Sequence, residues 1–110
     1  MKNIRWNDKA RDFVRSLDVN TKREIGALLM LIQSGRSLNE PQSKPMKSIH
    51  KNANELRVKD KKGVYRVIYV LRVGDSVYIP HAFTKKTQKT PKKEIDLSVQ
   101  RLKELLDETK

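Results

Sequence analysis

The side chains best suited to chemistry in this sequence are cations that a strand pattern would gather on one surface. Residues 55–59 and 64–72 alternate like neighbouring antiparallel strands, and a third strand is expected at 76–84. Alternation places cations of the first two strands on one outward face, and a lysine pair follows the third strand. These residues are Arg57, Lys59, Arg66, Lys85 and Lys86. Such a cluster can bind a phosphodiester and offset the charge that develops on its oxygens in a transition state.

The net charge of the chain is concentrated around these cations. The 110 residues include 25 Lys+Arg and 13 Asp+Glu, a formal charge of +12. Residues 44–93 hold fourteen basic and only three acidic side chains, which accounts for eleven of the twelve excess positive charges. Because the basic residues interleave with apolar strand residues, a fold places them, and this favours a nucleic-acid partner over a merely solubilising surface.

Residue content excludes several other kinds of site. The chain has no cysteine, so disulfides, thiolate zinc sites and cysteine nucleophiles are excluded. His50 and His81 are far apart in the sequence, which argues against a histidine-rich metal site, and we expect no metal or cofactor. No stretch approaches the roughly 20 apolar residues that cross a bilayer. We therefore expect a cytoplasmic protein with no membrane partner.

The apolar pattern predicts an α+β domain. Spacings of i, i+3, i+4 and i+7 indicate helices, whereas runs rich in Val, Ile and Tyr indicate strands. In order, the expected elements are a short strand at 4–6, helices at 10–17 and 21–34, a loop at 35–50, strands at 55–59, 64–72 and 76–84 with turns at 61–63 and 73–75, and a helix from 91 onward. Residues 1–110 are predicted to form one domain, a three-stranded antiparallel meander with the helices packed on one face.

The sequence supports specific predictions for three side chains in or next to the cluster. Arg66 should project from the open face of the sheet, so its replacement by alanine should leave the fold intact. Glu55 lies on the same side and is expected to be an ion-pair partner. His81 is a candidate for acid–base work, but it shares alternation with apolar residues, which favours a packed, hydrogen-bonded core histidine. A bulge at Pro80 would change that alternation.

Three segments of the sequence resemble a known family. They are Glu55-Leu56-Arg57, Gly63-Val64-Tyr65-Arg66-Val67-Ile68-Tyr69, and His81-Ala82-Phe83-Thr84-Lys85-Lys86-Thr87-Gln88-Lys89-Thr90-Pro91. Together they resemble the RelE/ParE superfamily of toxins, and within it the phage-associated HigB-like branch. The likeness covers nearly the whole chain, because the order and length of the expected helices and strands also match. It implies a RelE-like fold.

The resemblance also implies a function, that of the toxin in a type II toxin–antitoxin pair. Such toxins enter the ribosomal A site and cut messenger RNA without a metal, by attack of the 2′-hydroxyl on the neighbouring phosphate. By position, Arg57 and Arg66 would bind the scissile phosphate and stabilise the transition state. Lys86, with Lys85 beside it, would stabilise charge or assist proton transfer. Further contacts to RNA would come from Lys59, Lys62, Lys89, Lys92 and Lys93.

One feature of the superfamily is missing, because no aromatic residue or histidine follows Lys86. Well-understood members often have a tyrosine or histidine near the C-terminus that stacks on or activates the RNA. The identity of the general base therefore stays open, and the candidates are His81, a lysine of lowered pKa and Lys59.

The resemblance predicts partners as well as chemistry. They are the ribosome with its mRNA and a cognate antitoxin, expected to be a helix-turn-helix HigA-like protein, through which DNA would be contacted only indirectly. Two other functions stay open: a ParE-like inhibitor of DNA gyrase, and a catalytically inactive RNA-binding module whose affinity depends steeply on salt. The arginine–lysine cluster disfavours the gyrase inhibitor.

Overall fold

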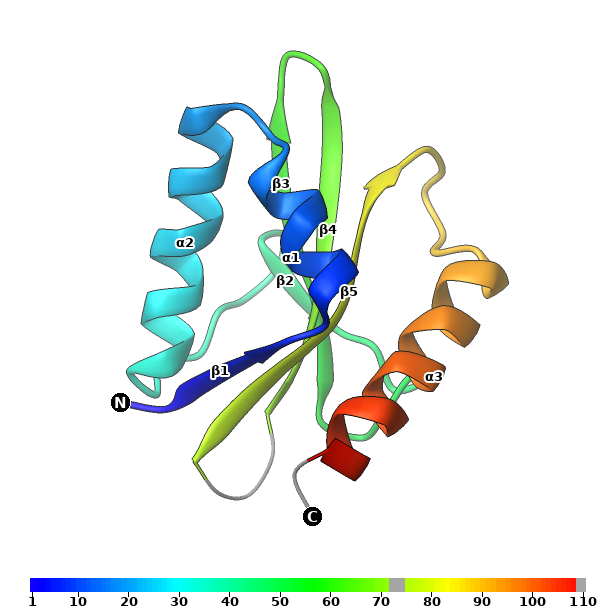
Figure 1. Ribbon diagram of the computed structural model, residues 1–110. Helices are drawn as coiled ribbons and strands as arrows, with labels where there is room; N and C mark the ends of the chain where they lie inside the picture. The colour runs from blue at the N-terminus through cyan, green and yellow to red at the C-terminus, as the bar shows by residue number, and fades with distance from the viewer. Residues whose placement is uncertain (72–74, 109–110) are drawn as a thin grey trace.

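In this computed structural model residues 1–71 and 75–108 are described, and they form three helices and five strands (Figure 1). In chain order the elements are β1 (Asn3–Trp6), α1 (Asp8–Arg15), α2 (Val19–Gln33), β2 (Ser43–Pro45), β3 (Ala53–Asp60), β4 (Gly63–Leu71), β5 (Ser76–Lys85) and α3 (Lys92–Glu108). The predicted α+β class and the order of the predicted elements are confirmed. The short β2 lies inside the segment expected to be a loop, and Val73 and Gly74 of the predicted second turn lie outside the described residues. No described helix is both long and apolar enough to cross a membrane.

All five strands form one sheet, in the order β1-β5-β4-β3-β2. Within it β3, β4 and β5 make the predicted antiparallel meander, in which Arg57 lies opposite Arg66 and Val64 lies opposite Lys85. The strand β2 pairs with β3 in antiparallel fashion, whereas β1 pairs with β5 in parallel. Because directly opposite residues share a face, the register brings Arg57, Arg66 and Lys85 to the same face, toward the β3–β4 turn.

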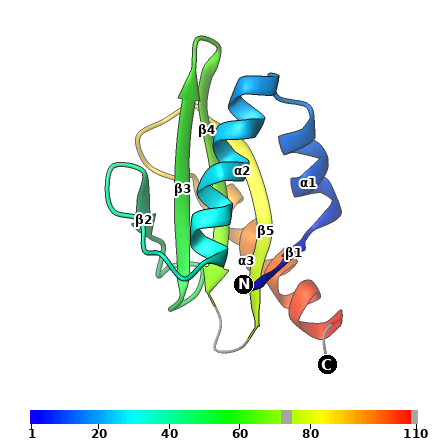
Figure 2. The same cartoon turned by 90° about the vertical axis from the view of Figure 1, so that its left-hand side faces the viewer.

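Helices cover both faces of the sheet, which corrects the expectation that they share one face. The helices α1 and α2 pack on one face through a core that includes Ile25 and Val67. The helix α3 packs on the other face, where Leu102 belongs to a second core with Ile68 and Val70. Figures 1 and 2 show α2 and α3 on opposite sides of the β3–β4 hairpin. The reason is that β4 carries apolar residues on both of its faces, and each face needs a cover.

The strand β5 contains an irregularity next to Pro80. Ile68 lies opposite His81 and Val70 lies opposite Tyr78, so β5 has one more residue than β4 in this interval. A proline has no N–H to donate to the ladder, which suits it to a bulge. The extra residue moves His81 to the face covered by α3.

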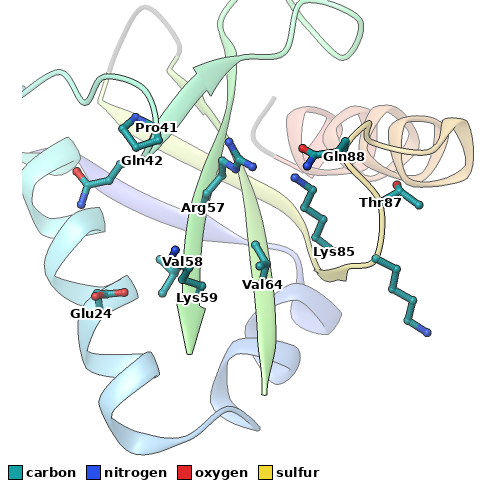
Figure 3. A pocket seen from close by; sticks show the side chains of 11 residues that line it. Glu24, Pro41, Gln42, Arg57, Val58, Lys59, Val64, Lys85, Thr87 and Gln88 are labelled. Atoms are coloured by element: carbon teal, nitrogen blue, oxygen red, sulfur yellow. The ribbon is translucent and has the colours of Figure 1, made fainter. Parts of the chain in front are cut away.

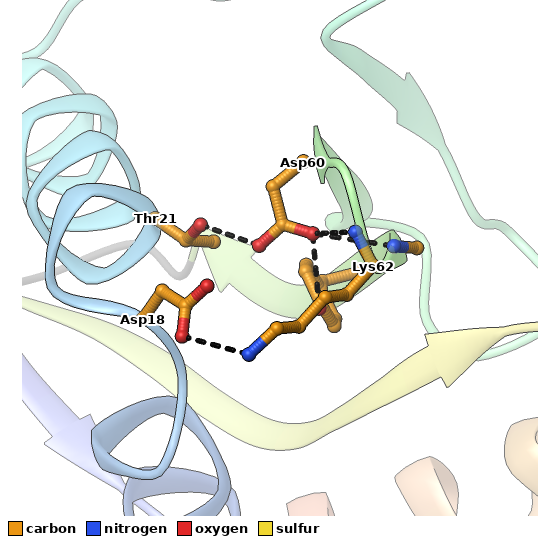
Figure 4. A network of polar contacts seen from close by, with 6 residues as sticks. Asp18, Thr21, Asp60 and Lys62 are labelled. Atoms are coloured by element: carbon orange, nitrogen blue, oxygen red, sulfur yellow. Dashed lines mark hydrogen bonds and ion pairs between the residues drawn. The ribbon is translucent and has the colours of Figure 1, made fainter.

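The β3–β4 turn is tied to the start of α2 through Asp60 (Figure 4). The Asp60 carboxylate accepts hydrogen bonds from Thr21 Oγ1 at 2.7 Å, the backbone N–H of Lys62 at 2.8 Å and the Tyr65 hydroxyl at 3.2 Å. Lys62 Nζ also pairs with Asp18 Oδ1 at 3.3 Å. The hydrogen bond from Thr21 is the main cause that lowers the pKa of Asp60 below its usual value, because these donors favour the charged carboxylate.

We expect replacement of Asp60 by alanine to lower the melting temperature at neutral pH, because Thr21, Lys62 and Tyr65 lose a shared acceptor. A carboxylate whose pKa is lowered by folding stabilises the protein above its ordinary pKa of about 3.9, and this contribution is lost as the pH falls through the folded-state pKa. The difference in melting temperature between wild type and Asp60→Ala should therefore shrink in acid. The exposed Asp12 is the matched control, and Asp12→Ala should melt like the wild type. A difference that stays constant from neutral to acidic pH would contradict the prediction.

Candidate active site

An open pocket of about 780 Å³ lies where the β3–β5 meander meets the segment that follows β5 (Figure 3). Eleven residues line it, and four of them are the cations Arg57, Lys59, Lys85 and Lys86. The only acidic residue among the eleven is Glu24 of α2. The pocket is therefore strongly positive and large enough for a phosphate with its flanking sugars.

Arg57 and Lys85 reach this pocket from two different strands. Arg57 is opposite Arg66 and Lys85 is opposite Val64, so both side chains leave the same face of the sheet. The backbone N–H of Arg57 donates to the carbonyl oxygen of Gln42 at 2.8 Å, which holds the segment before β2 along the pocket wall. In Figure 3 the charged ends of Arg57 and Lys85 point toward one another. Two cations held in this way can bind one anion between them.

Lys85 is chemically distinct from an ordinary surface lysine. It is half-buried at the end of β5. Burial lowers its pKa first, and the positive charges of Arg66, Arg57 and Lys44 lower the pKa further. A lysine in this environment gives up its proton more readily than a solvated one. Lys85 therefore fits the lysine of lowered pKa that was one of the three candidates for the general base.

The expectation that Arg66 projects from an open face is wrong. Arg66 has no exposed surface, and neither has Glu55, with which it forms an ion pair. Arg66 Nη1 also donates to Thr90 Oγ1 at 3.0 Å, and Nη2 donates to the carbonyl oxygen of Gln88 at 3.2 Å. The physical reason is that α3 and the segment leading to it cover the face that strand alternation alone leaves open. Glu55 is an ion-pair partner, as predicted, but a buried one.

Sequence reasoning does not identify Gln88 and Thr90 as partners of the buried Arg66–Glu55 pair. Thr90 precedes Pro91 and was interpreted as the cap of the last helix. Its hydroxyl instead donates to Glu55 Oε2 at 2.6 Å, and the carbonyl oxygen of Pro91 accepts from the N–H groups of Glu94 and Ile95. No sequence signal distinguishes the two uses of a threonine hydroxyl before a proline.

His81 is a buried, hydrogen-bonded core residue, which the sequence analysis favoured. Its ring stacks on Phe83 with centroids 5.0 Å apart, and it does not line the pocket. Arg101 Nη1 lies 2.9 Å from Nδ1, and Glu94 Oε1 lies 3.1 Å from Nε2. Burial is the main cause that lowers the pKa of His81, so the ring is neutral near pH 7, accepts from Arg101 and donates to Glu94.

The lysines expected to contact RNA are spread over the surface. Lys59 lines the pocket, whereas Lys62 pairs with Asp18 near the start of α2. Lys92 lies 3.8 Å from Asp96 on α3. Lys89 and Lys93 are exposed. Within the described ranges, no three His, Asp or Glu side chains are grouped so that they could hold a metal ion.

Comparison with protein families gives one match that spans most of the chain. Residues 12–103 match the family described as Phage derived protein Gp49-like (DUF891). Among curated protein sequences, none is similar enough to this chain to count as a match.

Solved structures of the E. coli RelE toxin share the fold. The crystal structure of the isolated E. coli RelE toxin superposes with a TM-score of 0.57 at 11% identity, covering 81% of this chain and 89% of that chain. A double arginine-to-alanine mutant of E. coli RelE in the free state gives a TM-score of 0.61 at 14% identity, covering 92% and 97%. The RelE-like fold implied by the sequence resemblance is thereby confirmed.

Proposed function

Because the chain belongs to the phage-derived Gp49-like family and has the fold of the RelE toxin, we propose that it is the toxin of a type II toxin–antitoxin pair. In this proposal residues 1–110 are one HigB-like toxin domain, an endoribonuclease that acts in the cytoplasm and cuts translated mRNA in the ribosomal A site. The observation that carries the proposal is the meeting of Arg57, Lys85 and Lys86 in one positive pocket.

The proposed reaction is attack of an RNA 2′-hydroxyl on the adjacent phosphorus. The 2′-O–P bond forms and the bond from phosphorus to the 5′-oxygen breaks, which leaves a 2′,3′-cyclic phosphate and a 5′-hydroxyl. The neutral form of Lys85 takes the proton of the 2′-hydroxyl, and the ammonium of Lys86 supplies one to the 5′-oxygen. Arg57 binds the phosphate and stabilises the extra charge of the transition state. Because its side chain does not reach the surface, Arg66 is given no contact with the RNA.

The proposed partners follow from charge and fold. Lys59, Lys62, Lys89, Lys92 and Lys93 would add contacts to the RNA and ribosome that weaken with salt. The antitoxin is proposed to be a helix-turn-helix HigA-like protein, which would connect the pair to DNA. No cofactor and no membrane takes part in the proposed reaction.

Replacing Arg57 by alanine should strongly reduce cleavage while leaving the fold intact, because the side chain lines an open pocket. The loss expected from removing one transition-state donor is about 10²–10³-fold in rate. The measurement is induction of each variant in cells, followed by mapping of mRNA 5′ ends by primer extension. Arg36→Ala, which removes an exposed arginine outside the pocket, is the matched control and should cut like the wild type.

The outcomes separate the three functions. New cuts within translated codons that are lost in Arg57→Ala support the interferase. Growth arrest with intact mRNA would move the assignment to a gyrase inhibitor, which a supercoiling assay would test. Absence of both arrest and cuts would favour an RNA-binding module.

A further inference from the structure

We propose that Arg66 is a positioning residue, which holds the segment 86–90 in place so that Lys86 faces the pocket. This inference rests on the proposed function, but it assigns Arg66 an action through other residues and none on the phosphate itself. The name clamp is used below for four residues: Glu55, Arg66, Gln88 and Thr90.

The clamp joins two strands to the segment that follows the third. Glu55 and Arg66 belong to β3 and β4, and their buried ion pair provides the fixed half. Gln88 and Thr90 provide the other half, through the Gln88 carbonyl at 3.2 Å and the Thr90 hydroxyl at 3.0 Å from the guanidinium. The Thr90 hydroxyl closes the ring by donating to Glu55 Oε2 at 2.6 Å. An arginine suits this role because its planar fork donates to several acceptors in a fixed geometry.

The burial of Arg66 argues against direct contact with RNA. Both terminal nitrogens of the guanidinium are engaged in the clamp, and its Nε is buried without a hydrogen-bond partner among the described residues. A phosphate could reach the guanidinium only if the segment 86–90 moved away. That movement would separate Thr90 from Glu55 and expose the buried pair. In the closed arrangement Arg66 therefore acts by holding the segment and does not contact the phosphate.

The clamp ties a solvent-exposed stretch of chain to the buried ion pair. Residues 86–89 are all exposed, yet Lys86 and Gln88 line the pocket. Arg57, in contrast, is held by the β3 ladder and does not depend on the segment. Opening the clamp should therefore displace Lys86 while leaving Arg57 in place. Cleavage should then show a lower kcat with little change in KM.

Thr90→Val tests the clamp without removing a buried charge. Valine keeps the shape of threonine but loses the hydroxyl that bonds Arg66 and Glu55, whereas Thr90→Ser keeps the hydroxyl. Trypsin cleaves after lysine, so nicking after Lys86 and Lys89, followed by mass spectrometry, reports how often the segment opens. We expect Thr90→Val to be nicked at least about tenfold faster than wild type, since two hydrogen bonds to charged groups are lost. Thr84→Val makes the same change at an exposed position of β5 and should be nicked at the wild-type rate.

A second variant removes the ion pair of the clamp. Replacing both members of the ion pair, Glu55→Met with Arg66→Met, avoids an unpaired buried charge and should fold. It should be nicked at least as fast as Thr90→Val.

Cleavage of mRNA on ribosomes, measured for the same variants, completes the test. We expect kcat to fall in Thr90→Val with KM nearly unchanged, and Thr90→Ser to restore kcat. Wild-type nicking of Thr90→Val, or faster nicking with unchanged kcat, would overturn the inference, and so would failure of Thr90→Ser to rescue. If the wild type cleaves no mRNA, the proposed function fails by itself, and the nicking rates still decide whether the clamp holds the segment.

Discussion

Replacement of Arg66 by alanine is expected to lower the free energy of unfolding by about 3–5 kcal/mol, because breaking a buried ion pair leaves an uncompensated charge inside the protein. Glu55 would be that charge, and it has no exposed surface on which water could replace the lost guanidinium. Strand alternation alone, which makes Arg66 an outward side chain, predicts a change of at most about 0.5 kcal/mol. The two expectations differ enough for one urea titration to decide between them.

The control for this prediction is the double variant Glu55→Met with Arg66→Met. Replacing a buried ion pair by apolar side chains of similar volume is often neutral or stabilising, so the double variant should unfold near the wild-type midpoint. Arg36→Ala, at an exposed position, should also unfold like the wild type. A loss of less than about 1 kcal/mol in Arg66→Ala would show that the pair is not buried in solution.

This expectation changes how the activity of an Arg66 variant is interpreted. Loss of toxicity in Arg66→Ala would normally be attributed to a missing phosphate contact. Here the same loss follows from unfolding, or from release of the segment that carries Lys86. Arg57, whose side chain lines the open pocket, is the arginine whose replacement reports on phosphate binding.

Much of the fold could be predicted because local patterns and tertiary contacts agree. The meander of β3, β4 and β5 follows from Val, Ile and Tyr runs, with β3 and β4 separated by a turn at Lys61-Lys62. The strand β2 could not be predicted, because three residues ending in Pro45 have no period and pair only through the edge of β3. The sequence does contain a signal for the face that α3 covers, because Ile68 and Val70 form an apolar row on that face of β4. Which helix covers that row depends on packing and not on local pattern.

Sequence reasoning could predict the part of the candidate site that strand pairing alone positions. The turn between β3 and β4 and their alternating residues place Arg57 opposite Arg66. Lys85 reaches the same face only because β5 has one extra residue next to Pro80, which alternation alone does not predict. The burial of Arg66 depends instead on Gln88 and Thr90, which lie 22 and 24 residues later and fold back over it. Alternation gives the face of a strand residue but not what covers that face.

Replacement of Lys85 by arginine is expected to reduce cleavage about 10²–10⁴-fold, the usual contribution of a general base. Arginine keeps the positive charge but does not release its proton, so a variant that still binds RNA would lack the base. Lys85→Met should lose a similar factor in kcat and also bind RNA more weakly. Single-turnover cleavage of mRNA on ribosomes, with RNA affinity measured separately, distinguishes the two effects. Full activity in Lys85→Arg would show that only the charge of Lys85 matters.

The pH dependence of cleavage tests the same assignment through a residue outside the pocket. A base acts in its deprotonated form, so cleavage should rise with pH and level off above the pKa of Lys85, which lies below the ordinary lysine value of about 10.4. The charge of Lys44 is one of the causes that lower this pKa. Lys44→Met should therefore raise the pKa of Lys85 and move the rising limb of the profile to higher pH. The control is Lys47→Met, which removes a nearby exposed lysine that has no such effect on Lys85. A rising limb of the pH profile that moves equally in both variants, or in neither, would contradict the assignment of Lys85 as the base.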